Sequence, residues 1–125
     1  MPSITEQLSV ILNSLKSNVM GVEKAIVGSS DGLILASTTH EESDERMSAM
    51  CASLLSIGRR TAETLTKPTL NDVTVRTSEG YITIFAVARD AVIVVATSGE
   101  QKNLGMLYLE GSKAAKAMQK VFEQS

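Results

Sequence analysis

Three places in the sequence carry side chains that could do chemistry, and the first is the group Ser29-Ser30-Asp31-Gly32. Small polar residues like these can hold a phosphate, but a phosphate loop needs more glycines, a following lysine and a helix just downstream. Here Leu33-Ile34-Leu35 follows, which is typical of a strand. Asp-Gly between two apolar β segments favours a tight hairpin turn of the I′ type. We therefore interpret this group as a turn and not as a ligand site.

The second group is the acidic segment His40-Glu41-Glu42-Ser43-Asp44-Glu45. Its carboxylates could bind a cation, but it lacks the alternating acidic ligands and the bidentate partner of a calcium site. Ser43 or Asp44 can instead cap a following helix, whose first turn favours negative charge. His40 is the single histidine and has no ligand set or nucleophile beside it in the sequence. We expect no metal and no cofactor.

The third candidate is Cys51, the single cysteine, which would need a nearby base to act as a nucleophile. It falls on the apolar face of a predicted helix, where a thiol most often behaves as a small hydrophobic group. No pair of carboxylates lies in apolar surroundings that would separate their pKa values for acid–base catalysis. We therefore predict that the protein is not an enzyme.

Composition narrows the class of protein further. The 125 residues suffice for one domain, and with 43% hydrophobic but 3% aromatic residues the core must be aliphatic. A net charge of -2 and few aromatic rings argue against nucleic-acid binding. The sequence shows neither a signal peptide nor an apolar run long enough to cross a membrane. We expect no membrane insertion and a cytoplasmic location.

The spacing of apolar residues predicts eight elements in the order α-β-β-α-β-β-β-α. Helices are expected over residues 3–18, about 44–65 and 104 to about 122, and strands over 22–29, 33–38, 70–77, 81–88 and 91–97. The segment AVIVVAT (91–97) is apolar on both faces and should be central, whereas 70–77 alternates and fits an edge. The expected fold class is α/β (α+β): a single domain over 1–125, with helices on both faces of a five-stranded, mainly antiparallel sheet.

Two residues mark the ends of predicted helices, and three lysines lie on one side of the third helix. Pro68 ends the turn after the second helix, and Asn103 is a good cap for the third. Lys113, Lys116 and Lys120 line one side of that third helix. A lysine row can bind acidic partners or phosphates, but we interpret this one as a solvated face.

The second helix has an unusual outer side. Its predicted core face consists of Met47, Met50, Cys51, Leu54, Ile57, Gly58, Thr61 and Leu65. The predicted outward residues are small, and no charged residue lies between Arg46 and Arg59. Such a face allows another backbone to come close, so we expect a second subunit to cover it. The predicted homodimer interface comprises Ala49, Ala52, Ser53 and Ser56, together with Val73, Val75 and Thr77 on the edge strand.

This element order, with particular residues, resembles the roadblock / dynein light chain family, which includes MglB-type prokaryotic members. The resemblance extends from Leu8 to about Met118 and includes the small-residue helix that begins near Met47. The segments that carry it are Gly21-Val22-x-x-Ala25, Ser30-Asp31-Gly32-Leu33, Arg89-Asp90-Ala91 and Asn103-Leu104-Gly105-Met106-Leu107. It implies a roadblock domain of profilin/longin-like architecture, in which the second helices pack across a two-fold axis and the third strands pair.

The resemblance also implies a function: a regulator or binding platform for a small Ras-like GTPase and, as in some relatives, a GTPase-activating partner. Carried onto this chain, the charged end of the second helix, Arg59, Arg60 and Glu63, becomes the contact for the GTPase. We do not interpret either arginine as a catalytic finger, because adjacent arginines on a helix rim are more often solvated or interface charges. The alternatives are a nucleotide-indifferent structural adaptor or light-chain subunit, and a small-ligand sensor.

Overall fold

The computed structural model describes residues 2–67, 69–88, 90–99 and 104–124. Its helices are α1 (Ile4–Asn18), α2 (Ser43–Thr64) and α3 (Leu104–Glu123), and its strands are β1 (Val22–Ser29), β2 (Ile34–Ser37), β3 (Asp72–Thr77), β4 (Gly80–Val87) and β5 (Ala91–Ser98). The predicted element order is confirmed. The expected roles of Pro68, Arg89 and Asn103 fall on residues outside the described part of the chain.

The five strands form one antiparallel sheet in the order β2-β1-β5-β4-β3. β5 is central and buried along its length up to Thr97, as its apolar sequence predicts. β3 is an edge strand, also as predicted, and among the described strands it pairs with β4. Adjacent strands are therefore joined by hairpins, except where β1 and β5 meet from distant parts of the sequence.

The group Ser29-Ser30-Asp31-Gly32 is a hairpin turn, but not of the I′ type. Only Gly32 has positive φ (89°), whereas a I′ turn would need it at Asp31 as well. The backbone N–H of Gly32 donates to Ser29 O at 2.9 Å, and that of Ser29 donates to Leu33 O at 2.8 Å. This is a three-residue loop with glycine in the left-handed position, and it leaves no open cradle for a phosphate.

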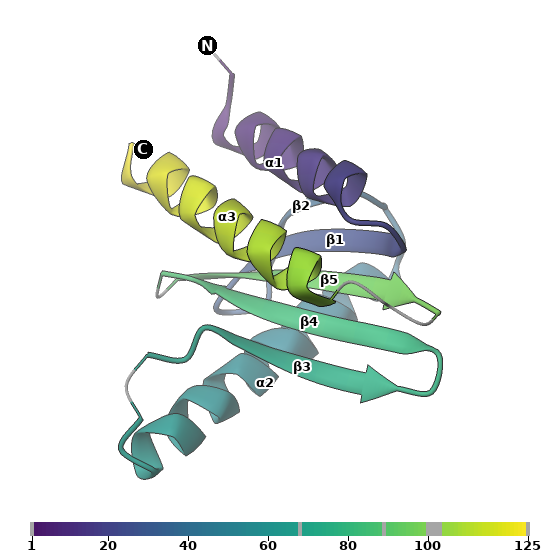
Figure 1. The fold of residues 1–125 in the computed structure, drawn as a ribbon. Helices are drawn as coiled ribbons and strands as arrows, with labels where there is room; N and C mark the ends of the chain where they lie inside the picture. The colour runs from purple at the N-terminus through teal and green to yellow at the C-terminus, as the bar shows by residue number, and fades with distance from the viewer. Residues whose placement is uncertain (1, 68, 89, 100–103, 125) are drawn as a thin grey trace.

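Helices cover the two faces of the sheet unequally (Figure 1). α1 and α3 lie side by side on one face, and α2 lies on the other by itself. The α1/α3 side encloses the larger core, in which Leu8, Leu12 and Met118 pack on Phe85 and Ile93. On the α2 side a smaller cluster joins Cys51 and Leu55 to the sheet. The sheet thus separates a larger core, covered by two helices, from a smaller core covered by one helix.

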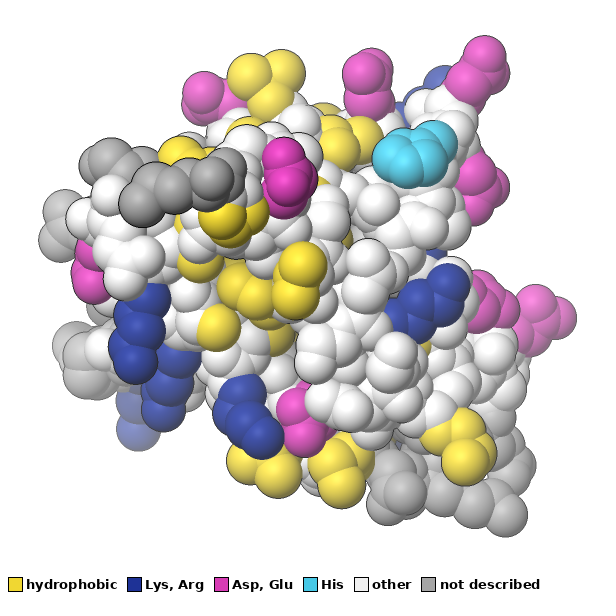
Figure 2. Space-filling view, turned by 90° about the horizontal axis from the view of Figure 1, so that it is seen from above, with side chains coloured by type: hydrophobic (Ala, Val, Ile, Leu, Met, Phe, Trp, Pro, Cys, Tyr) yellow, Lys and Arg dark blue, Asp and Glu magenta, His cyan; other side chains and the backbone are white. Residues whose placement is uncertain are grey.

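The outer face of α1 and α3 carries mixed side chains. Figure 2 shows this face from above, with apolar side chains in small patches among charged and other polar ones. No helix in the described part of the chain is long and apolar enough to cross a membrane.

Candidate functional site

The candidate site is the outward side of α2, and its position is fixed where the helix begins. Asp44 is buried in the first turn, where its carboxylate accepts hydrogen bonds from Lys24 Nζ (2.6 Å), Thr39 Oγ1 (2.9 Å) and Ser37 Oγ (3.1 Å). It also accepts one from the backbone N–H of Glu41 at 3.2 Å. Neither Ser43 nor Asp44 is the N-cap that the sequence predicted, because both lie inside the helix. Asp44 instead ties the start of α2 to β1 and β2.

The electrostatics of this anchor favour the charged pair. Burial acts to raise the pKa of Asp44, but the ammonium of Lys24 and the hydrogen bonds from Thr39, Glu41 and Ser37 outweigh it, so the pKa is lowered. The hydrogen bond to Asp44 raises the pKa of Lys24; burial opposes this, and Glu41, 3.1 Å from the ammonium, reinforces it. The acidic segment that could have suggested a cation site therefore contributes to a structural anchor.

The face that α2 turns to the sheet combines the small residues Ser48, Cys51 and Ala52 with one large apolar residue, Leu55. Its buried residues are Asp44, Ser48, Cys51, Ala52 and Leu55, which recur at helical spacing. Two glycines make this close packing possible. A Cβ at Gly28 would collide with the side chain of Ser48, and one at Gly32 would lie 2.8 Å from the Cα of Ala49. The close approach of α2 to β1 and its turn thus leaves no space there for large side chains.

The predicted orientation of α2 is therefore partly wrong. Ala52 was expected to point outward but is only 8% exposed, against the sheet. Met50, Leu54 and Ile57 were expected in the core but are 54%, 39% and 52% exposed, and Thr61 and Leu65 are exposed too. Cys51 is buried as predicted, Met47 and Gly58 are half-buried, and Ala49, Ser53 and Ser56 are exposed as predicted. We call Met50, Leu54 and Ile57 the apolar stripe.

The edge of the sheet lies beside the apolar stripe. A Cβ at Gly58 would come within 2.9 Å of both Val73 Cγ2 and Leu70 Cδ2, so this part of α2 packs directly on β3. Val73 and Val75 are half-buried on the α2 side, and Thr77, at the end of the strand, is exposed. The outer backbone edge of β3 has no strand beside it in the described sheet. An apolar helix face thus adjoins an edge that can accept another strand.

The three charged residues at the end of α2 face different surroundings. Arg59 and Glu63 line a groove shared with β4 and α3, and Arg59 Nη2 donates a hydrogen bond to Ala88 O at 3.0 Å. Arg60 instead lines a shallow hollow with Ile57 and Leu65, at the end of the apolar stripe. The fold therefore does not gather Arg59, Arg60 and Glu63 into one cluster.

The remaining candidates for chemistry, Cys51 and His40, lie in different settings. Burial raises the pKa of the Cys51 thiol, which keeps it protonated and a poor nucleophile. His40 is exposed on the connection before α2. No group of three or more His, Cys, Asp and Glu side chains in the described part of the chain could hold a metal ion.

The sequence contained a signal for the correct orientation of α2. Assigning the largest apolar residues to the core selected Met50, Leu54 and Ile57, whereas Ser48, Ala52 and Leu55 follow an equally regular helical spacing. Glycines at positions 28 and 32 mark places where another backbone comes close. A helix that packs there needs small residues where it meets these glycines, and Ser48 and Ala49 occupy those places.

Comparison with known proteins now identifies the architecture. The chain matches the family model described as Roadblock/LC7 domain over residues 10–97. It matches no curated protein. Several solved structures share its fold, and MglB proteins from Thermus and Myxococcus are among them.

The gliding protein MglB of Thermus thermophilus is 15% identical, with a TM-score of 0.86 over 100% of this chain and 95% of that one. MglB of Myxococcus xanthus is 15% identical, with a TM-score of 0.84 over 94% and 96%. MglC of Myxococcus xanthus is 23% identical, with a TM-score of 0.63 over 91% and 98%. At these identities the likeness establishes the fold, and the function must be argued from the surface.

Proposed function

Because the chain belongs to the Roadblock/LC7 domain family, we propose that it is a non-catalytic, homodimeric regulator or binding platform for a small Ras-like GTPase in the cytoplasm. The GTPase as partner follows from the family resemblance. The observation that carries the proposal is the apolar stripe on α2 beside the unpaired edge of β3. Large apolar side chains at helical spacing on an exposed face are typical of a protein–protein interface.

The dimer forms where this surface meets a second copy of itself. Pairing of the two β3 edges, at Val73, Val75 and Thr77, joins the two sheets, and the two α2 helices then pack against each other. Ala49, Ser53 and Ser56 are small and exposed, so they allow the helix backbones to approach. The apolar stripe adds the large side chains that such an interface buries, while Ala52 serves the fold of each subunit. A stable interface of this kind buries about 1,200 to 2,000 Å².

The GTPase binds at the C-terminal end of the paired α2 helices, where Arg59, Arg60 and Glu63 supply charge. Contact with the switch loops of a GTPase would order them, and hydrolysis would then be carried out by the GTPase's own residues. With Arg59 and Arg60 on different sides of α2, they contact different parts of the partner or of the dimer.

The test is capture from the native lysate on the immobilised protein, run in parallel with GDP and with a non-hydrolysable GTP analogue. Mass spectrometry should identify a Ras-like GTPase retained in one nucleotide state, and its hydrolysis rate is then measured with and without this protein. Arg60→Glu should reduce retention, and Lys113→Glu, an equal charge change on the exposed side of α3, should not. Equal retention in both states would favour the adaptor, and retention of no GTPase would refute the proposal.

A further inference from the structure

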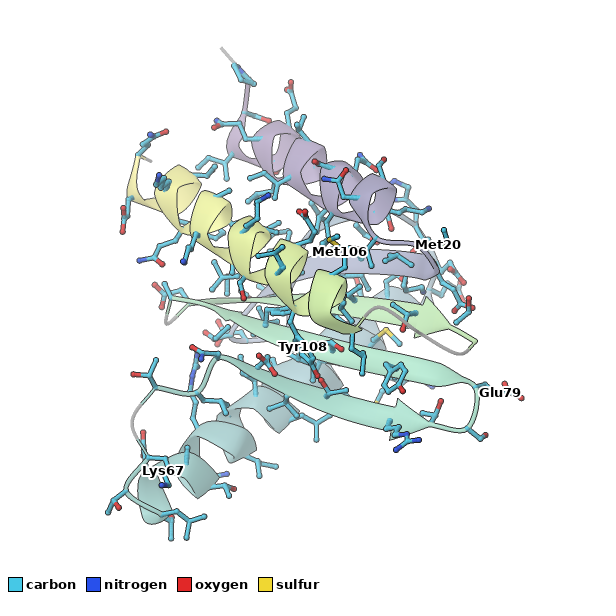
Figure 3. All side chains as sticks on the ribbon, viewed as in Figure 1. Met20, Lys67, Glu79, Met106 and Tyr108 are labelled. Atoms are coloured by element: carbon cyan, nitrogen blue, oxygen red, sulfur yellow. The ribbon has the colours of Figure 1, made fainter. Side chains whose placement is uncertain are left out.

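A groove with a volume of about 870 Å³ lies at one end of the sheet. Its walls come from the last turns of α2, the connection from α2 to β3, the end of β4 and the middle of α3. Figure 3 shows Lys67 on that connection, at the end of the molecule where α2 stops. The groove is separate from the apolar stripe: Met50, Leu54 and Ile57 do not line it.

The groove concentrates positive charge in a chain whose net charge is -2. Arg59, Lys67 and Lys116 line it, against the single carboxylate of Glu63. None of these three cations forms an ion pair with a carboxylate of the described residues, whereas Lys24 and Lys113 do. Three cations against one carboxylate leave the groove with a net positive charge, which attracts an anionic ligand.

One of these cations is already held in place. The hydrogen bond from Arg59 Nη2 to Ala88 O restrains the guanidinium at the groove wall, and a guanidinium has further N–H groups that can donate. Ala88 and Thr69, which both line the groove, have φ of 53° and 61°, a region that non-glycine residues rarely adopt. Strained backbone of this kind is concentrated at functional sites.

The lining between the cations is mixed. Leu70, Ala86 and the buried ring of Phe85 are apolar, and Asn71 and Gln119 add amide groups that can donate hydrogen bonds. Small-molecule sites are concave and enclose most of their ligand. This groove is open to solvent, and its cations come from three separate elements, so it suits a chain segment that passes along it.

We propose that this groove binds an acidic, extended segment of a partner protein. Its carboxylates would pair with Arg59, Lys67 and Lys116, and an apolar side chain between them would pack on Leu70 and Phe85. The proposal goes beyond the proposed function, because it requires neither the GTPase nor the dimer. The lysine row of α3, interpreted from the sequence as a solvated face, thereby gains a role at Lys116.

The test uses a fluorescein-labelled peptide of three Glu-Glu-Leu repeats and a second peptide with Gln in place of Glu. Fluorescence anisotropy should show the Glu peptide binding, with affinity falling as salt is added. Lys67→Glu and Lys116→Glu should each weaken binding about tenfold, because each places a like charge in the groove. Lys113→Glu is the matched control on the same helix and should change the affinity less than about twofold. Circular dichroism checks that each variant is folded.

The outcomes separate this proposal from the previous one, because Lys67 and Lys116 are not among the proposed GTPase contacts. Shifts of Thr69, Asn71 and Ser112 in an amide NMR spectrum on adding the Glu peptide would support the groove. Absence of binding, equal binding of the Gln peptide, or equal loss with Lys113→Glu would overturn it. Displacement of the peptide by phenyl phosphate at equal or lower concentration would also overturn it, in favour of a phosphate-bearing ligand.

Discussion

The helices on the two faces of the sheet bury their apolar side chains to different extents. On one face α1 and α3 together enclose a core in which Leu12, Ile93 and Met118 are fully buried. On the other face α2 buries Leu55 and Cys51 but leaves its apolar stripe exposed. One face is complete within the subunit, and the other keeps apolar surface that a second molecule can cover.

Glycines on both faces show how close packing assigns these roles. Gly111 of α3 lies directly on the ring of Phe85, which gives that helix a large aromatic side chain to pack on. On the α2 side the glycines lie in β1 and its turn, where Gly28 contacts Ser48 and Gly32 contacts Ala49 of the helix. Small residues meet the sheet at these glycines, while Leu55 is buried and Met50, Leu54 and Ile57 lie outside. If the proposed dimer forms, the first face serves stability and the second serves association.

The largest expected effect is on stability, and it follows from a change in the core beneath α1 and α3. Phe85→Ala should lower the free energy of unfolding by about 3 to 5 kcal/mol, because it removes a buried ring and leaves a cavity beneath α3. Chemical denaturation measures this change. Sedimentation at concentrations where the variant stays folded should show an unchanged association state. A stability change below about 1 kcal/mol would contradict a tightly packed core on this side.

The next effect should fall on association and not on the fold. Ile57→Glu places a charge within the apolar stripe and should weaken the dimer by about 2 kcal/mol or more, close to 30-fold in Kd. Sedimentation equilibrium measures the Kd, and the stability of the monomer should change by less than about 0.5 kcal/mol.

The matched control for that variant is Val10→Glu. Val10 is 68% exposed on α1, so the variant adds the same charge on the other face of the sheet and should leave the dimer intact. A dimer unaffected by Ile57→Glu, or equally weakened by both variants, would contradict the assignment of roles to the two faces.

The smallest expected effect concerns the anchor at the start of α2. Asp44→Asn should cost about 1 to 3 kcal/mol of stability near neutral pH, because Lys24 loses its buried, charged partner. Since the pKa of Asp44 is lowered, its contribution is present above the ordinary value of 3.8 and is lost as pH falls through the folded value. The pKa of Lys24 is raised, so its contribution is present below 10.5 and is lost as pH rises above it.

Denaturation midpoints measured from neutral to acidic pH check the anchor. The wild type should lose more stability than Asp44→Asn over the acidic range. Glu45→Gln, a change at the exposed neighbouring carboxylate, should follow the wild type. Parallel curves for wild type and Asp44→Asn would show that Asp44 does not act through its charge.

Much of the architecture could be predicted from local sequence, because the signals were local. The segment AVIVVAT is apolar at every position that must face either layer, so it could only be a central strand. The alternation in β3 indicated an edge, and the small polar run before Leu33 indicated a turn. The turn type was wrong because Asp31 does not adopt positive φ, a detail that the dipeptide does not determine.

Which side of α2 faces the sheet was decided by tertiary structure. The sequence determined that this segment is a helix with apolar residues on more than one side. The close approach at Gly28 and Gly32 then set Ser48 and Ala49 against the sheet, because a backbone contact excludes larger side chains whatever their hydrophobicity. Ala52, one turn after Ser48, lies buried on the same side.

The same distinction holds for the charged residues. Sequence determined that Arg59, Lys67 and Lys116 are charged and lie at or near helices. Only the fold brings them around one groove. The chain returns from α2 into β3, and α3 crosses the sheet beside it. Arg59 and Lys116 therefore line the same groove although they lie 57 positions apart in the sequence. Local sequence fixes the type of each element and its turns through short-range backbone and solvation preferences, whereas contacts between distant segments decide which faces stay exposed.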